Sequence, residues 1–239
     1  MSEVKKIKYQ IAGKKIEAPN VVTLELSCLF NLPSYCAGQF IDVYFPELNT
    51  PQGKSYSLSS APSENKFSIT VKAIGEFSNR LFNMKEGDYL VSSPPYGFFY
   101  SDQENTHLVM LAGGIGIAPF RATIAEQLAK NPTKNERKMS LFYSSQTEED
   151  IIFKSELNLW QEENPNLKIK HFITRQEKVS PDKQKGRITA EYVLKEISDL
   201  KNAEFLICGS ISFVRDMRRG LRDAGVPEET IYTEAFFSH

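Results

Sequence analysis

Apolar and polar residues alternate with a period of two along much of the first hundred residues, in short runs bounded by Gly, Pro, Asn or Asp. This alternation predicts β-strands, because successive side chains of a strand point to opposite faces of a sheet. The expected strands are 21–27, 38–45, 54–60, 66–73 and 88–94, with a helical turn at 77–84. Short strands at this spacing are typical of a closed antiparallel barrel or a sandwich.

After about residue 105 the pattern changes to apolar runs that alternate with stretches of helical periodicity. Phe120, Ile124 and Leu128, for example, recur every four residues, which predicts an amphipathic helix over 119–130. Strands are expected at 106–112, 138–144, 167–174, 204–209 and 230–236, and further helices at 149–160, 189–197 and 212–225. This alternation predicts a parallel sheet with helices on both faces.

The change of pattern predicts two domains. We expect an antiparallel β-barrel over residues 1–102, followed by an α/β parallel-sheet domain over residues 103–239. The boundary is expected in the polar run 100–106.

Composition narrows the functional classes. Hydrophobic content of 41%, charged content of 25% and a net charge of −1 are typical of a globular protein with no affinity for nucleic acid. The polar first ten residues and the short apolar runs predict neither a secretory signal nor membrane insertion. Three cysteines and three histidines without metal-ligand spacing predict no metal site and a cytoplasmic location.

The run LAGGIGIAPF places three glycines between a predicted buried strand and a predicted helix. A nucleotide pyrophosphate can approach bare backbone there, beside the free N–H groups of the helix start. The alternative is a tight turn that binds nothing. The common dinucleotide motif would need glycine in place of Pro119 and an acid at the end of the next strand, which reads LFYSS. We therefore predict a nucleotide site of a different lineage.

Six short motifs occur in a characteristic order: KSYS, SITVK, GEFS, PPYGFF, GGIGIAP and CGS. Together they resemble the ferredoxin–NADP⁺ reductase family over essentially the whole chain. That family joins an antiparallel flavin-binding barrel to a nicotinamide-nucleotide domain. The resemblance implies an FAD-dependent NAD(P)H oxidoreductase.

For the flavin, the resemblance implies that Lys54 meets the phosphate, Tyr56 packs on the isoalloxazine ring and Ser57 hydrogen-bonds near N5. Lys54 departs from the family's arginine. It keeps the charge but loses the planar, two-pronged donor. The other implied flavin-binding residues are Ser55, Val71, Lys72, Ala73, Gly75 and Ser78.

For the nicotinamide nucleotide, the resemblance places Cys208 at the hydride-transfer centre, with Glu234 close to it as a proton carrier or partner contact. A buried structural cysteine and a solvated terminal acid are the alternatives. Phe236 either covers the flavin's other face or packs the chain end. Ser144 and Arg175 are candidates for binding the 2′-phosphate of NADPH. The choice between NADH and NADPH as the nucleotide stays open. The remaining implied residues are Gly114, Gly116, Ile117, Ala118, Pro119 and Gly209.

The expected catalytic residues are Ser57, Cys208 and Glu234. Electrons are expected to pass from NAD(P)H through FAD to a protein carrier, because three cysteines cannot hold an iron–sulfur cluster. That carrier would be a ferredoxin, a flavodoxin or an oxygenase component. The alternatives are an NAD(P)H:flavin reductase with a small diffusible acceptor, and an electron-transfer subunit active only within a larger complex.

Overall fold

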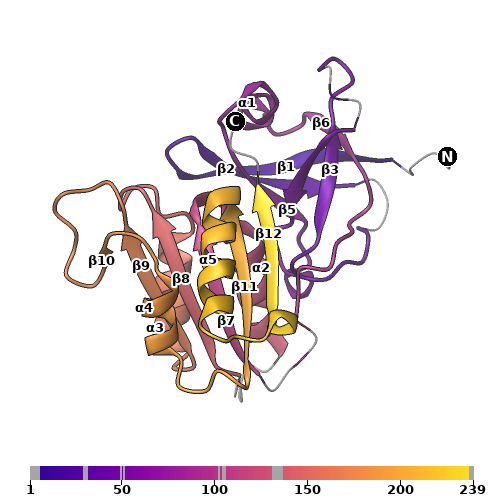
Figure 1. The fold of residues 1–239 in the computed structure, drawn as a ribbon. Coiled ribbons are helices and arrows are strands. Elements are labelled where there is room, and N and C mark those ends of the chain that lie inside the picture. Colours follow the sequence, from indigo (N-terminus) through magenta and orange to yellow (C-terminus); the bar gives the residue numbers. More distant parts are fainter. Residues whose placement is uncertain are drawn as a thin grey trace. The chain divides into compact units, whose positions relative to one another are not determined.

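The computed structural model describes residues 6–28, 32–48, 50, 52–101, 103, 106–130 and 137–236. The chain forms two compact units (Figure 1). The first comprises residues 1–98 together with 118–130, and the second comprises residues 99–117 together with 131–238.

The first unit is built on an antiparallel sheet. Among the described residues it has six strands, in the order β4-β3-β6-β1-β2-β5. The strands are β1 (Ile7–Ala18), β2 (Val21–Ser27), β3 (Phe40–Tyr44), β4 (Lys54–Ser57), β5 (Ser68–Lys72) and β6 (Tyr89–Ser92). The sheet closes because Leu58 forms an antiparallel bridge with Ile69, and the Ser59 N–H donates to the Ser68 carbonyl at 2.8 Å. The predicted antiparallel barrel is confirmed.

Strand β1 is a long element that the sequence pattern missed, as it also missed the two-residue strand β10 (Gln184–Lys185) of the second unit. It pairs with both β2 and β6, and its Tyr9 and Ile11 are buried in the barrel core. Its register against β2 shifts between Ile11 and Gly13 and again between Ile16 and Ala18. Each irregularity shifts the order of inward and outward side chains, so a regular period of two is lost.

Alternate residues of the barrel strands fill its interior. Val22, Leu24 and Leu26 of β2 are buried, and the rings of Tyr9 and Phe67 stack with their centroids 5.2 Å apart. The short helix α1 (Glu76–Asn83) adds Phe77 and Leu81 to the same core. A 3₁₀ turn, η1 (Pro62–Glu64), follows the closure point. The barrel thus gives β4 and α1 a rigid support.

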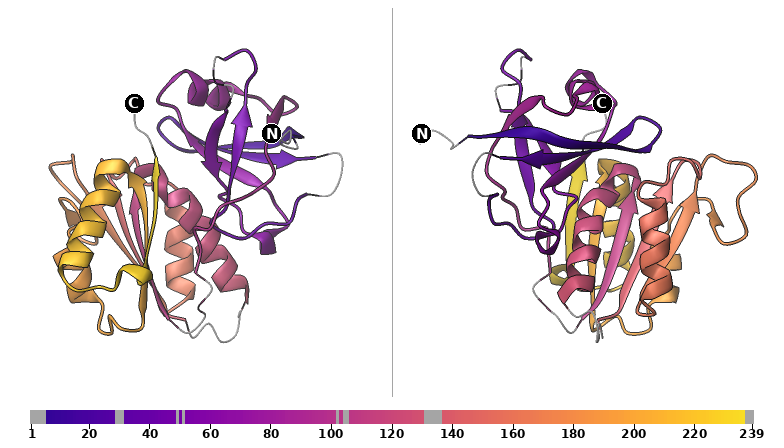
Figure 2. Two further views of the ribbon diagram at one scale, coloured as in Figure 1. Left: turned by 45° about the vertical axis from the view of Figure 1, so that its right-hand side comes forward. Right: turned by 180° about the vertical axis from the view of Figure 1, so that it is seen from behind.

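The second unit contains a parallel sheet. Its described strands lie in the order β10-β9-β8-β7-β11-β12, and every pairing is parallel. Helix α3 (Lys154–Glu163) covers one face, and α4 (Ala190–Glu196) and α5 (Ile211–Asp223) cover the other (Figure 2). The strands are β7 (His107–Gly113), β8 (Met139–Ser145), β9 (Leu167–Ile173), β10 (Gln184–Lys185), β11 (Ala203–Ser210) and β12 (Ile231–Phe236). The predicted α/β architecture is confirmed. From β7 the strand order runs outward in one direction to β10 and in the other direction to β12, so the order switches between β7 and β11.

Helix α3 begins later than the predicted 149–160. Phe153 adopts a left-handed backbone conformation with φ of 59°, and the helix starts at the next residue. Asp150 instead closes a turn, because its carboxylate accepts from the Thr147 N–H at 3.0 Å and from the Thr147 hydroxyl at 2.8 Å. The 3₁₀ turns η2 (Gly114–Gly116) and η3 (Glu228–Thr230) complete this unit.

A buried ion pair lies near the amino ends of the sheet strands. The Arg137 guanidinium lies 3.3 Å from the Glu204 carboxylate, and the two side chains are 5% and 2% exposed. Arg137 also donates to the hydroxyls of Ser101 and Thr106, at 2.8 Å and 3.1 Å. These hydrogen bonds offset the cost of burying two charges. Through Arg137, these hydrogen bonds link Ser101 and Thr106, which lie between β6 and β7, to Glu204 of β11.

Candidate functional site

Strand β4 carries the residues predicted to meet a flavin. Lys54 and Ser55 are exposed, Tyr56 is half-buried and Ser57 is buried. The Tyr56 ring stacks on Phe77 of α1, with centroids 6.2 Å apart and planes 22° apart. Burial raises the pKa of the Tyr56 phenol above its ordinary value, so the ring is neutral at physiological pH. A half-buried, neutral aromatic ring is suited to contact a flat ligand.

Ser55 takes part in a polar cluster that the sequence did not predict. Its hydroxyl donates to Oδ1 of Asp42 at 2.6 Å, and the Tyr96 hydroxyl donates to Oδ2 of the same carboxylate. Asp42 lies directly opposite Ser55 in the β3–β4 register. Tyr96 belongs to the PPYGFF motif, in which the Phe98 side chain is 86% exposed. Asp42 could have been found only from the strand register.

Gly75 and Ser78 form the turn that begins α1. The Ser78 hydroxyl accepts the N–H groups of Ile74 and Gly75, each at 3.0 Å, and donates to the Gly75 carbonyl at 3.1 Å. A Cβ added at Gly75 would meet nothing within 4 Å, so the space beside this turn is open. Ser78 therefore shapes the turn, and the first turn of a helix leaves N–H groups without partners inside the helix, which suits this end of α1 to an anion.

The predicted residues Val71 and Lys72 of β5, and Ala73 directly after it, offer mainly backbone to a ligand. The Val71 side chain is buried in the barrel core, and Lys72 is half-buried. The Ala73 N–H donates to the Asn20 carbonyl at 2.8 Å. Among these three residues, Lys72 is therefore the one with a polar side chain available for a phosphate.

In the second unit, the glycine turn follows β7 directly and leads into α2 (Ile117–Lys130). Gly114 has φ of +55°, a left-handed conformation that favours glycine, and a Cβ there would meet nothing within 4 Å. A Cβ at Gly116 would lie 2.3 Å from the Cys208 carbonyl oxygen. Only glycine permits this approach, so the turn and the end of β11 meet at the carboxyl edge of the sheet.

Gly209 allows a second close approach at the same edge. A Cβ there would lie 3.2 Å from the Cα of Gly113 and 2.8 Å from the Phe213 ring. The side chains of Ile117, Ala118 and Pro119 are buried, so these residues present backbone to a ligand. The structure thus brings Gly114, Gly116 and Gly209 to the carboxyl ends of the paired strands β7 and β11, which is the usual place for a nucleotide in such sheets.

Cys208 and Glu234 lie next to each other on neighbouring strands. Cys208 pairs with Ala112 of β7 on one side and with Glu234 of β12 on the other. Burial raises the pKa of the Cys208 thiol well above its ordinary value, and the Glu234 carboxylate raises it further. The thiol therefore stays protonated at neutral pH, which excludes a thiolate nucleophile here. Phe236, two residues after Glu234, is half-buried opposite Ser210.

Ser144 and Arg175 lie near the carboxyl ends of β8 and β9. The Arg175 side chain is exposed, and the backbone N–H of Arg175 donates to the Gln146 carbonyl at 2.8 Å. Beside these strand ends is an open cavity of about 660 Å³. Its lining residues are Thr147, Glu148, Glu149, Gln176, Lys178, Val179 and Ser180. Two carboxylates against one ammonium group give this cavity little attraction for a 2′-phosphate.

Two further findings concern metals and membranes. Within the described ranges, no group of three His, Cys, Asp or Glu side chains could hold a metal ion. No helix in the described part of the chain is long and apolar enough to cross a membrane.

Known proteins resemble this chain in sequence and in fold. The model of the oxidoreductase NAD-binding domain matches residues 110–219. A flavohemoprotein from Bordetella pertussis is 31% identical over 221 residues, which are 85% of this chain and 53% of that protein. The chain thus spans about half the length of this curated relative.

Two solved structures share the fold. The FAD/NAD-binding domain of nitric oxide dioxygenase from Vibrio cholerae superposes with a TM-score of 0.83 at 21% identity, covering 96% of this chain and 98% of that one. A ferredoxin NADP⁺ reductase from Neisseria gonorrhoeae, with FAD and NADP bound, gives a TM-score of 0.80 at 24% identity, covering 98% of this chain and 100% of that one.

Proposed function

We propose that this chain is an FAD-dependent NAD(P)H oxidoreductase of the ferredoxin–NADP⁺ reductase family and that it passes electrons to a small protein carrier. The observation that carries the proposal is the close approach of Gly116 to the Cys208 carbonyl. It gathers the predicted nucleotide turn and the predicted hydride-transfer cysteine at one edge of a parallel sheet. That is where a nicotinamide nucleotide is expected to bind.

The residues present fit a flavin. Tyr56 offers a neutral ring face, the Gly75 turn leaves open space at the start of α1, and Lys54 and Lys72 supply positive charge for phosphates. Bound FAD would accept a hydride from NAD(P)H and release the electrons singly. The chain's own part would be to orient FAD and the nicotinamide nucleotide toward each other, to keep Cys208 protonated and to exclude water.

The roles of single residues in the proposal follow from their surroundings. Ser57 is a buried hydroxyl next to Tyr56 and is suited to hydrogen-bond near the reacting flavin nitrogen. Glu234 lies beside Cys208 and is more exposed, so it can exchange protons with solvent. The carrier would be a ferredoxin, a flavodoxin or an oxygenase component.

A visible spectrum and an anaerobic titration test the proposal. The purified chain, reconstituted with FAD, should be yellow and should lose its flavin absorbance when NADH or NADPH is added. A chain that stays colourless after reconstitution would contradict the proposed function.

Acceptor assays test the finer part of the proposal. Rapid turnover with a ferredoxin or flavodoxin supports a protein carrier as acceptor. Fast reduction of free FMN without carrier turnover would instead identify a reductase of diffusible flavins.

A further inference from the structure

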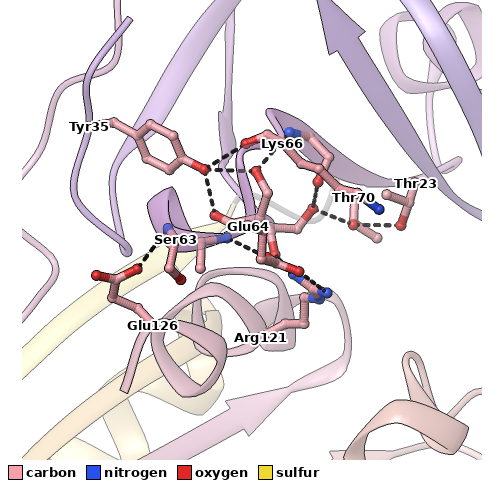
Figure 3. Close-up of polar contacts among 12 residues, drawn as sticks. Thr23, Tyr35, Ser63, Glu64, Lys66, Thr70, Arg121 and Glu126 are labelled. Carbon is pink, nitrogen blue, oxygen red and sulfur yellow. Dashed lines mark hydrogen bonds and ion pairs between the residues drawn. The ribbon is translucent and has the colours of Figure 1, made fainter. Parts of the chain in front are cut away.

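Polar contacts between α2 and the segment around η1 fix this helix on the barrel (Figure 3). Nη2 of Arg121 donates to Oε1 of Glu64 at 2.8 Å, and Nη1 donates to Oε2 of the same carboxylate. Such a two-pronged pair is both strong and directional. Farther along α2, the Glu126 carboxylate accepts the Ser63 N–H at 3.1 Å. The helix is therefore held at two points along its length.

The Arg121–Glu64 pair is shielded from solvent. The two side chains are 13% and 25% exposed, and the Glu64 carboxylate also accepts the Ala61 N–H at 2.6 Å. Burial alone would raise the pKa of the Glu64 carboxyl, but the hydrogen bonds from Arg121 and Ala61 lower it below the ordinary value. The pair is therefore ionised at neutral pH, and salt screens it less than an exposed pair.

Arg121 also holds the chain that leaves the flavin strand. Its Nη1 group donates to the Ser59 carbonyl at 3.0 Å, and Ser59 is two residues beyond Ser57. Ser59 is itself fixed, because its N–H donates to the Ser68 carbonyl at 2.8 Å and its hydroxyl lies 3.0 Å from that of Ser68. One guanidinium thus contacts both the extension of β4 and the turn η1.

The glycine turn directly precedes the helix that carries Arg121. Helix α2 starts at Ile117, immediately after Gly116, so Arg121 lies one turn into the helix that the glycine turn begins. A helix transmits a displacement at its first turn directly to the residues before it. The contacts of Arg121 therefore fix the first turn of α2, which directly follows the glycine turn in the chain, and the extension of β4 beyond Ser57.

We propose that Arg121 and Glu64 are positioning residues for hydride transfer, which hold the start of α2 against the extension of the Tyr56–Ser57 strand. The inference rests on the proposed function. Neither residue needs to touch a cofactor. Hydride transfer requires the reacting atoms to lie about 3–3.5 Å apart, and a misplacement of about 1 Å costs roughly a hundredfold in rate. Loss of the pair should therefore slow the transfer more than it weakens cofactor binding.

The test measures flavin reduction by NADH and NADPH in anaerobic stopped flow, using the full chain loaded with FAD. Glu64→Gln keeps the size of the side chain and removes its charge, and Arg121→Met removes the guanidinium. We expect the limiting reduction rate to fall by about tenfold or more, with FAD affinity and the KM for the nucleotide changed by less than about threefold. The charge-swapped double variant, Glu64→Arg with Arg121→Glu, should recover part of the rate.

Lys195→Met is the matched control, because it removes an exposed ion pair with Glu191 on α4, where the Lys195 ammonium lies 2.7 Å from the carboxylate. It should leave the rate unchanged. Equal rates in wild type and both single variants would overturn the inference, as would a parallel loss of rate and FAD affinity without rescue by the swap. Hydrogen exchange separates the two proposals. If α2 amides exchange faster in Glu64→Gln but NAD(P)H never reduces the wild type, the proposed function has failed although the contact holds the helix.

Discussion

At the scale of single residues, burial sets the chemistry of the predicted site. The Tyr56 phenol and the Cys208 thiol both have a raised pKa, chiefly because they are desolvated. Both are therefore neutral at physiological pH. They can act through shape, contact and hydrogen bonding, and not as charged groups or nucleophiles. We therefore expect substitution of Tyr56 to affect FAD binding and substitution of Cys208 to affect the rate of flavin reduction.

Tyr56→Ala should weaken FAD binding. The substitution removes the ring that stacks on Phe77 and is predicted to contact the isoalloxazine. We expect the dissociation constant for FAD to rise by about tenfold, measured by quenching of flavin fluorescence. Tyr56→Phe keeps the ring and should bind FAD like the wild type. Unchanged affinity in Tyr56→Ala would exclude the assigned contact.

Cys208→Ser should slow flavin reduction more than it weakens flavin binding. The residue is fully buried between Ala112 and Glu234, so serine places a hydroxyl where a neutral thiol now packs. We expect the reduction rate in stopped flow to fall by about tenfold with FAD affinity nearly unchanged. An equal loss of rate and affinity would indicate a structural cysteine.

At the scale of elements, strand pairing determines which side chains meet. His171 of β9 lies against Tyr143 of β8, with ring centroids 5.8 Å apart, and its Nδ1 is buried with no hydrogen-bond partner among the described residues. Burial lowers the pKa of His171 to about 4. The charged groups Lys183, Asp182, Lys154 and Glu148 surround it and partly cancel one another. The neutral imidazole is therefore part of the folded state.

This burial predicts a pH-dependent loss of stability. The folded-state pKa of His171, about 4, lies below the ordinary value of 6.5, so the unfolded chain binds the proton first as the pH falls. Stability is therefore unaffected by this group above about pH 6.5 and falls as the pH drops toward 4, and the loss reaches about 2 kcal/mol at about pH 5. Urea unfolding at about pH 7.5 and about pH 5 measures it. In His171→Phe, the difference in the free energy of unfolding between these two pH values should shrink by that amount. An unchanged difference would rule out His171 as the source.

At the scale of the whole molecule, each compact unit offers its own predicted binding surface. The barrel unit carries Tyr56, Ser57 and the Gly75 turn, and it includes most of α2. The parallel-sheet unit carries the glycine turn, Cys208 and Glu234. A ligand that binds only the folded state stabilises it by mass action, so thermal unfolding reports on the cofactor directly.

FAD should raise the melting temperature. At a free concentration of about a hundred times the dissociation constant it adds about 2.7 kcal/mol, which corresponds to about 5–10 °C for a chain of this size. Differential scanning fluorimetry with the apoprotein measures the shift. Riboflavin, which lacks the phosphates, should give a smaller shift. Equal shifts would argue against phosphate contacts at Lys54 and the Gly75 turn.

The sequence by itself determined the two architectures and the order of the motifs. Period-two and helical patterns depend only on neighbouring residues, so they predicted most strands and helices of both units. The tertiary structure alone decided the position of the irregular strand β1 and the pairing of Cys208 with Glu234. It also decided the burial of Glu204 beside Arg137 and the contact of Arg121 with Glu64. These features join residues that are far apart in the chain, and strand register and barrel closure, which no local pattern encodes, bring them together.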